Sequence, residues 1–190
     1  LGLLEPGNHV LTIRVDNRML LPYRPDSHAV SDAMGSTWNG IVGRIELQST
    51  PAVWLENVQA FPDVEKHAVR LVAKIGNATG KPGAGKISCG QALSEATWDS
   101  NGGTAETTVP LPKETPLWDE FHPSTFDLAV SLDFPDGKHS AAITTGLRSF
   151  TAKGREFLIN GRPVFLRGNH DGGGFPLTGH PPMDPASWRR

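Results

Sequence analysis

Apolar and polar residues alternate in several stretches of this chain, and that spacing predicts β-strands with one face in a core. The alternation is regular over residues 69–75 and again over residues 126–132, where charged or small residues separate the apolar ones. Shorter alternating runs occupy residues 11–15 and 41–47. The pattern predicts a mainly β protein built from antiparallel strands.

Turn signals separate the alternating runs. The chain contains 21 glycines and 16 prolines, which favours many short strands over long helices. Asn101-Gly102-Gly103 and Asp136-Gly137 each predict a turn between strands. Asn160-Gly161 is the pair that best tolerates the positive φ angles of a two-residue hairpin turn. Pro110 predicts that the strand around it lies at the edge of a sheet.

Two short motifs could suggest function but are better explained as loops. Lys81-Pro-Gly-Ala-Gly85 lacks the Gly-Lys-Ser/Thr ending of a phosphate-binding loop, so we expect a hairpin loop there. Asn77-Ala-Thr79 has the form of an N-glycosylation sequon, yet it reads first as a turn.

The strand pattern divides the chain into three parts. Residues 1–50 hold two predicted strands of an antiparallel sheet around a long polar loop at residues 17–37. Residues 51–150 have the strand number and spacing of an immunoglobulin-like sandwich without its disulfide. Residues 151–190 are predicted to begin a (β/α)₈ barrel, of which only the first strand and the start of a helix fit.

The last part carries the most informative stretch. Its residues 157–161 form a predicted hairpin, and Val164-Phe-Leu166 is a predicted buried strand. The strand is followed by Arg167-Gly-Asn-His-Asp171 and three glycines, where a barrel enzyme places site residues. Asp184 before Pro185 predicts the N-terminus of a helix.

Composition excludes several classes of function. The net charge of −2 gives no electrostatic reason to expect nucleic acid or an anionic membrane as a partner. No apolar run reaches the roughly 20 residues of a membrane span. Cys89 is the only cysteine, and we expect it to be a small buried apolar residue rather than a nucleophile. His170, Asp171 and His180 have the spacing of no common metal site, so neither a metal nor another cofactor is expected.

Three separated motifs resemble family 2 glycoside hydrolases, in the domain order of that family. Val15-Asp16-Asn17 with Trp38-Asn-Gly-Ile-Val-Gly-Arg44 resembles the end of its sugar-binding domain, which implies that residues 1–50 are the C-terminal part of a jelly-roll sandwich. Pro116-Leu-Trp118 with Gly146-Leu-Arg-Ser-Phe150 resembles its immunoglobulin-like domain. Phe157-Leu-Ile-Asn-Gly-Arg-Pro-Val-Phe-Leu-Arg-Gly-Asn-His-Asp171 is similar to the start of its catalytic barrel.

The resemblance implies part of a retaining β-glycosidase of the β-galactosidase, β-glucuronidase and β-mannosidase group, with β-galactosidase as the expected activity. Such enzymes use two glutamates, which the resemblance places on barrel strands beyond residue 190. The fragment itself is therefore expected to be inactive. Its expected partner is a carbohydrate substrate, and a homo-oligomer is possible. The family favours a bacterial periplasmic or secreted location, with a cytoplasmic one also open.

The resemblance also implies residues that bind the sugar. The family's first barrel strand ends in an Asn and a His, usually one residue apart, so Asn169 pairs with either His170 or Asp171 in that role. Alternatively, His170 and Asp171 pair with each other or with Arg167, for which a structural ion pair is expected. Asp32 is the nearest acidic residue upstream of Gly40-Ile41, where the family's first domain reaches the pocket. Trp38 would stack on a sugar or anchor the sandwich core.

Two other functions fit the sandwiches alone. A non-catalytic carbohydrate-binding or spacer module would need only the first 150 residues, as would an immunoglobulin-like adhesion protein. The strand, polar cluster and glycines after residue 160 favour the enzyme, because a stand-alone sandwich has no use for them.

Overall fold

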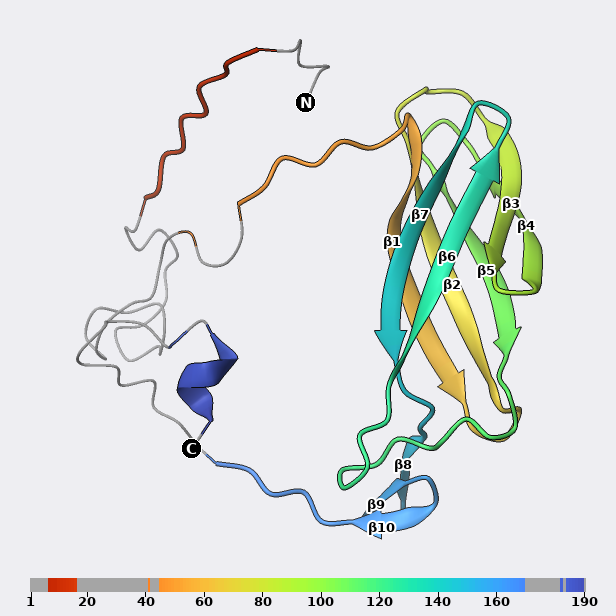
Figure 1. Cartoon of the computed structure of the whole chain (residues 1–190), viewed down its shortest axis with the longest axis vertical. Coiled ribbons are helices and arrows are strands. Elements are labelled where there is room, and N and C mark those ends of the chain that lie inside the picture. Colours follow the sequence, from red (N-terminus) through yellow and green to blue (C-terminus); the bar gives the residue numbers. More distant parts are fainter. Residues whose placement is uncertain (1–6, 17–40, 42–44, 170–181, 183, 190) are drawn as a thin grey trace. The chain divides into compact units, whose positions relative to one another are not determined.

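The computed structural model describes residues 7–16, 41, 45–169, 182 and 184–189 (Figure 1). The chain divides into two compact units: Leu1–Leu47 with Gly168–Arg190, and Gln48–Arg167. The described residues are mainly β, as the alternation predicted, and their strands form three antiparallel sheets.

Seven strands of the second unit form two sheets, of three and four strands. The orders are β1-β2-β5 and β4-β3-β6-β7. One core is shared by buried residues of both sheets, so the sheets pack face to face. The strands are β1 (Val53–Asp63), β2 (Ala68–Asn77), β3 (Gly83–Cys89), β4 (Ala92–Trp98), β5 (Gly103–Pro110), β6 (Phe126–Phe134) and β7 (Gly137–Thr145).

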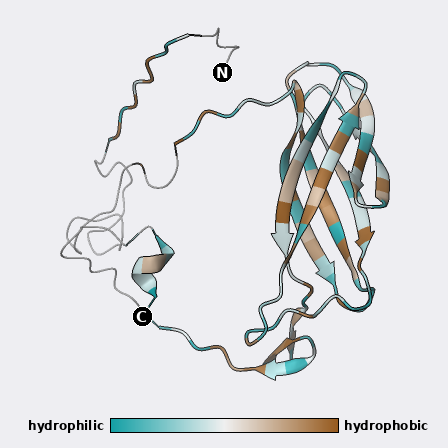
Figure 2. Cartoon of the chain, viewed as in Figure 1, coloured by the Kyte–Doolittle hydropathy of each residue, from teal (hydrophilic) through white to brown (hydrophobic). Residues whose placement is uncertain are grey.

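Strand alternation produces this core. Every second residue of β2 from Val69 to Ile75 is at most 1% exposed, and Val130 and Leu132 of β6 are fully buried. Figure 2 shows the corresponding alternation of hydrophobic and hydrophilic positions along the strands. The predicted strands at 69–75 and 126–132 are therefore confirmed. Cys89 is buried in the same core, as expected, and burial raises the pKa of its thiol, which makes it a poor nucleophile.

A third sheet follows the sandwich in the order β10-β9-β8. It consists of β8 (Phe150–Lys153), β9 (Glu156–Ile159) and β10 (Arg162–Val164). Asn160 has φ of 50° and Gly161 has φ of 76°, so the predicted two-residue turn is confirmed. The prediction that the strand around Pro110 is an edge strand is also confirmed, because β5 pairs only with β2.

The strands predicted near the N-terminus are not present among the described residues. Residues 7–16 and 45–50 form no strand, and Leu11 and Ile45 are 75% and 60% exposed. Alternation marks residues that can pair, but a strand also needs a neighbouring strand to satisfy its backbone groups. None of the described strands pairs with either segment.

The buried strand predicted at residues 164–166 is also wrong. Strand β10 ends at Val164, and Phe165 and Leu166 are 84% and 55% exposed. A short apolar run predicts a buried strand only where other elements cover both of its faces. The described residues supply no such cover.

Two further predictions need correction. Gly83 and Gly85 lie within β3, paired with β4, and not in a hairpin loop. A β-carbon at Gly83 would lie 2.8 Å from the ring of Trp98, so this strand position requires glycine. The glycines there permit close packing instead of a turn. Asp184 does cap a helical turn, but Pro185–Trp188 is a four-residue 3-10 helix and not the start of an α-helix. In the part of the chain that the structure describes, no helix has the length and apolarity to cross a membrane.

Candidate functional site

The structure describes one of the five residues predicted to bind sugar. Asn169 lies in the irregular segment after β10 and is exposed. His170, Asp171, Asp32 and Trp38 lie outside the described residues. The predicted contacts among the five therefore stay predictions.

Arg167 is not on the buried strand expected for it, and its possible pairing with His170 or Asp171 lies outside the described residues and stays a prediction. Its side chain is exposed, and it forms no ion pair with any residue that the structure describes. The prediction of a buried carboxylate partner assumed a buried strand, and that strand ends three residues earlier, at Val164.

The structure brings together the two motifs that resemble the immunoglobulin-like domain, 116–118 and 146–150. The backbone N–H of Trp118 donates to the carbonyl of Leu147 at 2.8 Å, and Leu147 is fully buried. The guanidinium of Arg148 lies 4.6 Å from the centre of the Trp118 ring, within the range of a cation–π contact. Gly146 packs against Trp118 so closely that an added β-carbon would lie 3.0 Å from the Trp118 β-carbon.

Asn160 joins the hairpin to these motifs. Its side-chain amide donates to the carbonyl of Trp118 at 2.9 Å, and its side-chain oxygen accepts from the N–H of Ser149 at 2.9 Å. Its own backbone N–H donates to the carbonyl of Ser149 at 3.0 Å. One turn residue therefore fixes the hairpin against two segments of the sandwich. The sequence showed the turn but not these partners, because Trp118 is 42 residues away.

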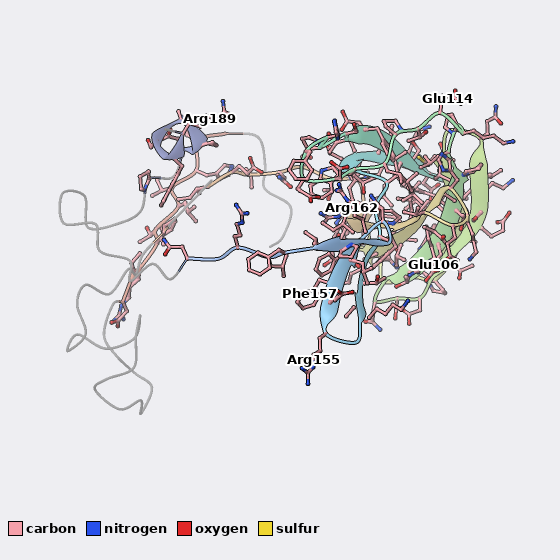
Figure 3. The ribbon with its side chains drawn as sticks, turned by 90° about the horizontal axis from the view of Figure 1, so that it is seen from below. Glu106, Glu114, Arg155, Phe157, Arg162 and Arg189 are labelled. Atoms are coloured by element: carbon pink, nitrogen blue, oxygen red, sulfur yellow. The ribbon has the colours of Figure 1, made fainter. Side chains whose placement is uncertain are left out.

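A second link is electrostatic. A guanidinium nitrogen of Arg162 lies 3.5 Å from Asp119 and 3.4 Å from Glu120, and the same group lies 5.6 Å from the centre of the Phe121 ring. Figure 3 shows Arg162 at the hairpin. We call these four residues with Asn160 and Trp118 the hairpin junction. No local pattern could have found them, because the carboxylates lie in a loop far from Arg162 in sequence.

Asp119 also organises its own loop. Its carboxylate accepts hydrogen bonds from the N–H groups of His122 and Phe121, and these bonds, led by that of His122, hold its pKa below the usual value. The charged form that binds Arg162 is therefore the form that the loop favours.

The hairpin presents aromatic surface beside the junction. The rings of Phe150 and Phe157 stack with centroids 5.5 Å apart, yet they remain 52% and 45% exposed. Phe157 is labelled on the hairpin in Figure 3. Phe165 and Leu166, on the segment that leads to Asn169, are also exposed.

A cleft of about 650 Å³ separates the hairpin from the turn between β1 and β2. Its lining includes Asp63, Lys66 and Arg70 on one side and Ser149 and Asn160 on the other. The carboxylate of Asp63 accepts from the N–H of Lys66 at 2.9 Å, which lowers its pKa. The cleft can donate and accept hydrogen bonds, and local hydrogen bonds favour the charged form of its Asp63 carboxylate.

This electrostatic pattern does not suit acid catalysis. Three carboxyl groups of the described residues have a resolved shift, and in Asp63, Asp119 and Asp184 the pKa is lowered by local hydrogen bonds. A glycosidase general acid needs a raised pKa. The described residues also contain no group of His, Cys, Asp and Glu that could hold a metal ion.

The fold resembles that of known sugar-cleaving enzymes. The structure of a family 2 β-galacturonidase of Eisenbergiella tayi bound to galacturonate matches with a TM-score of 0.60 and 17% identity, over 79% of this chain and 28% of that one. The glycerol-bound structure of a family 2 β-galacturonidase of the same organism matches with a TM-score of 0.56 and 15% identity, over 79% and 27%. A β-glucuronidase of Dictyoglomus thermophilum reaches a TM-score of 0.41, too low to establish a shared fold.

The likeness is one of structure. No protein-family model matches the sequence, and no curated protein matches it. The chain spans little more than a quarter of the length of the E. tayi enzyme. At this identity the match establishes a common fold over part of the chain, and the activity of the whole protein is a separate question.

Proposed function

We propose that this chain is part of a retaining β-glycosidase of the family 2 type. In this proposal residues 1–50 contribute to the sugar-binding domain, residues 51–150 form the immunoglobulin-like domain, and residues 151–190 begin the catalytic barrel. The observation that carries the proposal is the hairpin junction. It joins, in one structural unit, two motifs that resemble the same family and are about 40 residues apart.

The proposed substrate is a terminal β-linked sugar of galacto configuration. The sequence resemblance favoured β-galactosidase, and the E. tayi enzyme of similar fold is a β-galacturonidase. Galacturonate is galactose with its C6 carbon oxidised to a carboxylate, so both suggestions agree on the ring configuration. The two suggestions differ in whether C6 of the sugar is a hydroxymethyl group or a carboxylate, and hydrolysis of the two substrates distinguishes them.

In the proposed mechanism this chain supplies no catalytic carboxylate. Two glutamates outside residues 1–190 would act as acid/base and as nucleophile, with their carboxyl groups roughly 5–5.5 Å apart. The acid protonates the leaving oxygen while the nucleophile forms a glycosyl-enzyme. Water then releases the sugar, with the acid/base now taking a proton. The lowered pKa values of Asp119 and Asp63 agree with a supporting role for the described residues.

Asn169 would bind the sugar together with His170 or Asp171. An amide both donates and accepts hydrogen bonds, so the exposed side chain of Asn169 can pair with sugar hydroxyls. Asp32 and Trp38 are proposed as contributions from the first domain, as a hydrogen-bond acceptor and a stacking ring. The hairpin junction would fix the hairpin that precedes this segment against the sandwich.

The test uses the product of the complete reading frame that contains this chain. We expect it to hydrolyse p-nitrophenyl β-galactoside or β-galacturonide, and we expect residues 1–190 alone to release no nitrophenol. Asn169→Ala in the complete product should lower kcat/KM by about tenfold or more, because a sugar hydrogen bond is lost. Absence of turnover on galacto, gluco and manno substrates would contradict the proposal, as would turnover by the isolated chain.

A further inference from the structure

The outer face of the β1-β2-β5 sheet carries an ordered set of polar side chains. Strand β1 contributes Asn57, Gln59 and Phe61 to this face, and all three are exposed. Each lies beside a residue of β2 and, beyond it, a residue of β5. The three rows are Asn57, Lys74 and Thr104; Gln59, Val72 and Glu106; and Phe61, Arg70 and Thr108.

A β-bulge directs the first of these amides onto the face. The pairing of β1 with β2 shifts between Leu55 and Asn57, so Glu56 is the extra residue. Bulges re-aim side chains and are frequent beside functional sites. Asparagine is also depleted in strands, so Asn57 is expected to lower the stability of the strand slightly.

The charged side chains of this face are in ion pairs, whereas the amide side chains are not hydrogen-bonded to described residues. Lys74 pairs with Glu56 at 3.0 Å, and Arg70 pairs with Glu106 at 3.1 Å. The side chains of Asn57 and Gln59 make no hydrogen bond within the described part of the chain. The face therefore has its charges paired and its neutral donors and acceptors available.

The same face is hollowed. A hollow of about 500 Å³ lies over the first two rows and is lined by Asn57, Gln59 and Lys74, with Asn101 and Thr104 at its side. The cleft of about 650 Å³ described above begins at the third row, where Phe61, Arg70 and Thr108 line it. From Asn57 to Phe61 the strand advances about 13 Å, so the two hollows follow one another along β1.

We propose that this face of the sandwich binds a neutral oligosaccharide. Amides that donate and accept at once match pairs of sugar hydroxyls. The Phe61 ring, with the Arg70 guanidinium 4.6 Å from its centre, adds partly exposed apolar surface at the end of the row.

Lys74, Arg70 and Glu106 of this face are already in ion pairs. The carboxylate of Asp99, which also lines the hollow, accepts the N–H of Asn101 at 2.7 Å. The arrangement therefore favours a neutral chain over a charged one. The site does not depend on the proposed hydrolysis, so either can fail without the other.

The experiment is electrophoresis of the 190-residue chain in native gels that contain soluble polysaccharides. We expect retardation by a neutral β-linked polymer such as β-1,4-galactan or xyloglucan. Asn57→Ala with Gln59→Ala should weaken the retardation by about tenfold or more, because several hydrogen bonds to sugar are lost together. The control is Ser131→Ala with Ser140→Ala on the outer face of the other sheet, where the two hydroxyls bond each other at 2.9 Å.

Retardation that persists in the Asn57/Gln59 variant would overturn the proposal, as would retardation by polygalacturonate alone. Absence of retardation by every neutral polymer would also overturn it. Thermal unfolding of each variant excludes misfolding as the cause of a loss. If both amide changes together unfold the chain, Gln59→Ala alone gives the same comparison, with partial loss expected.

Discussion

Among single residues, Asn160 joins the hairpin to the sandwich through hydrogen bonds to Trp118 and Ser149. It combines a positive φ angle with three hydrogen bonds, two of them from its side chain. We expect Asn160→Ala to lower the free energy of unfolding by about 2 kcal/mol, from lost hydrogen bonds and backbone strain. Urea unfolding measures the change.

Asn160→Gly is the matched control, because glycine tolerates the positive φ angle and lacks only the side-chain bonds. It should be destabilised less than the alanine variant. Equal stability of all three proteins would show that the junction does not depend on Asn160.

His139 forms a hydrogen bond between the two sheets of the sandwich. Its Nδ1 atom accepts the backbone N–H of Leu55 at 3.1 Å and so joins β7 to β1, the edge strands of the two sheets. Leu55 is only 5% exposed, so loss of the acceptor would leave its N–H without a partner. We expect His139→Leu to cost about 1–3 kcal/mol and to speed amide exchange at Leu55.

His139→Gln keeps an acceptor at this place, so exchange at Leu55 should stay closer to that of the wild type. Unchanged exchange in the leucine variant would mean that another group satisfies this N–H.

Asp119 gives the junction a dependence on pH. Its pKa is lowered from the ordinary value of 3.8, so its contribution to stability is complete above that value and is lost as pH falls through the lower folded-state pKa. We expect Asp119→Asn to be less stable than the wild type at neutral pH. The difference should shrink below about pH 4.

Thermal unfolding from pH 2 to 7 follows this difference. A gap between the two proteins that is constant over the whole range would contradict a role for the charge of Asp119.

At the scale of elements, the sequence predicted local features well. The turn at Asn160-Gly161 and the strands at 69–75 and 126–132 follow from spacing alone, because turn chemistry and alternation act over a few residues. The runs at 11–15 and 41–47 have the same alternation but no strand partner among the described elements. Strand pairing depends on two segments, so the residue pattern of one segment cannot show whether a partner strand is present.

Glycines show the same limit. The glycines at 81–85 suggest a loop, yet Gly83 lies in a strand. Glycine is needed there because Trp98 of β4 occupies the space that a side chain would fill. Long-range packing of this kind has no local signal. The hairpin junction was missed for the same reason, since Asp119 and Arg162 meet only in the folded chain.

One turn offers a direct test of such packing. Gly102 has φ of +116°, and a β-carbon there would overlap the carbonyl of Ile75, whereas Gly90 has φ of +57° and open space around it. We expect Gly102→Ala to cost about 2–3 kcal/mol and Gly90→Ala about 1 kcal/mol. Urea unfolding of both variants tests this order, and a larger loss in Gly90→Ala would contradict it.

For the whole molecule, the sequence predicted part of a family 2 glycosidase, and the structure shows a fold similar to part of such an enzyme. The match to the E. tayi β-galacturonidase covers 79% of this chain at 17% identity, so the fold is retained where most side chains differ. The candidate site is less well defined than the fold. Of its predicted residues the structure describes Asn169, and sugar contacts would depend on residues outside 1–190.

The central claim is that this chain belongs to a retaining β-glycosidase. Its most direct test is the anomeric configuration of the first sugar that the complete protein releases, followed by proton NMR during hydrolysis of an aryl β-galactoside or β-galacturonide. We predict that the β-anomer forms first and then equilibrates with the α-anomer. Initial release of the α-anomer, or release of no sugar at all, would contradict the account.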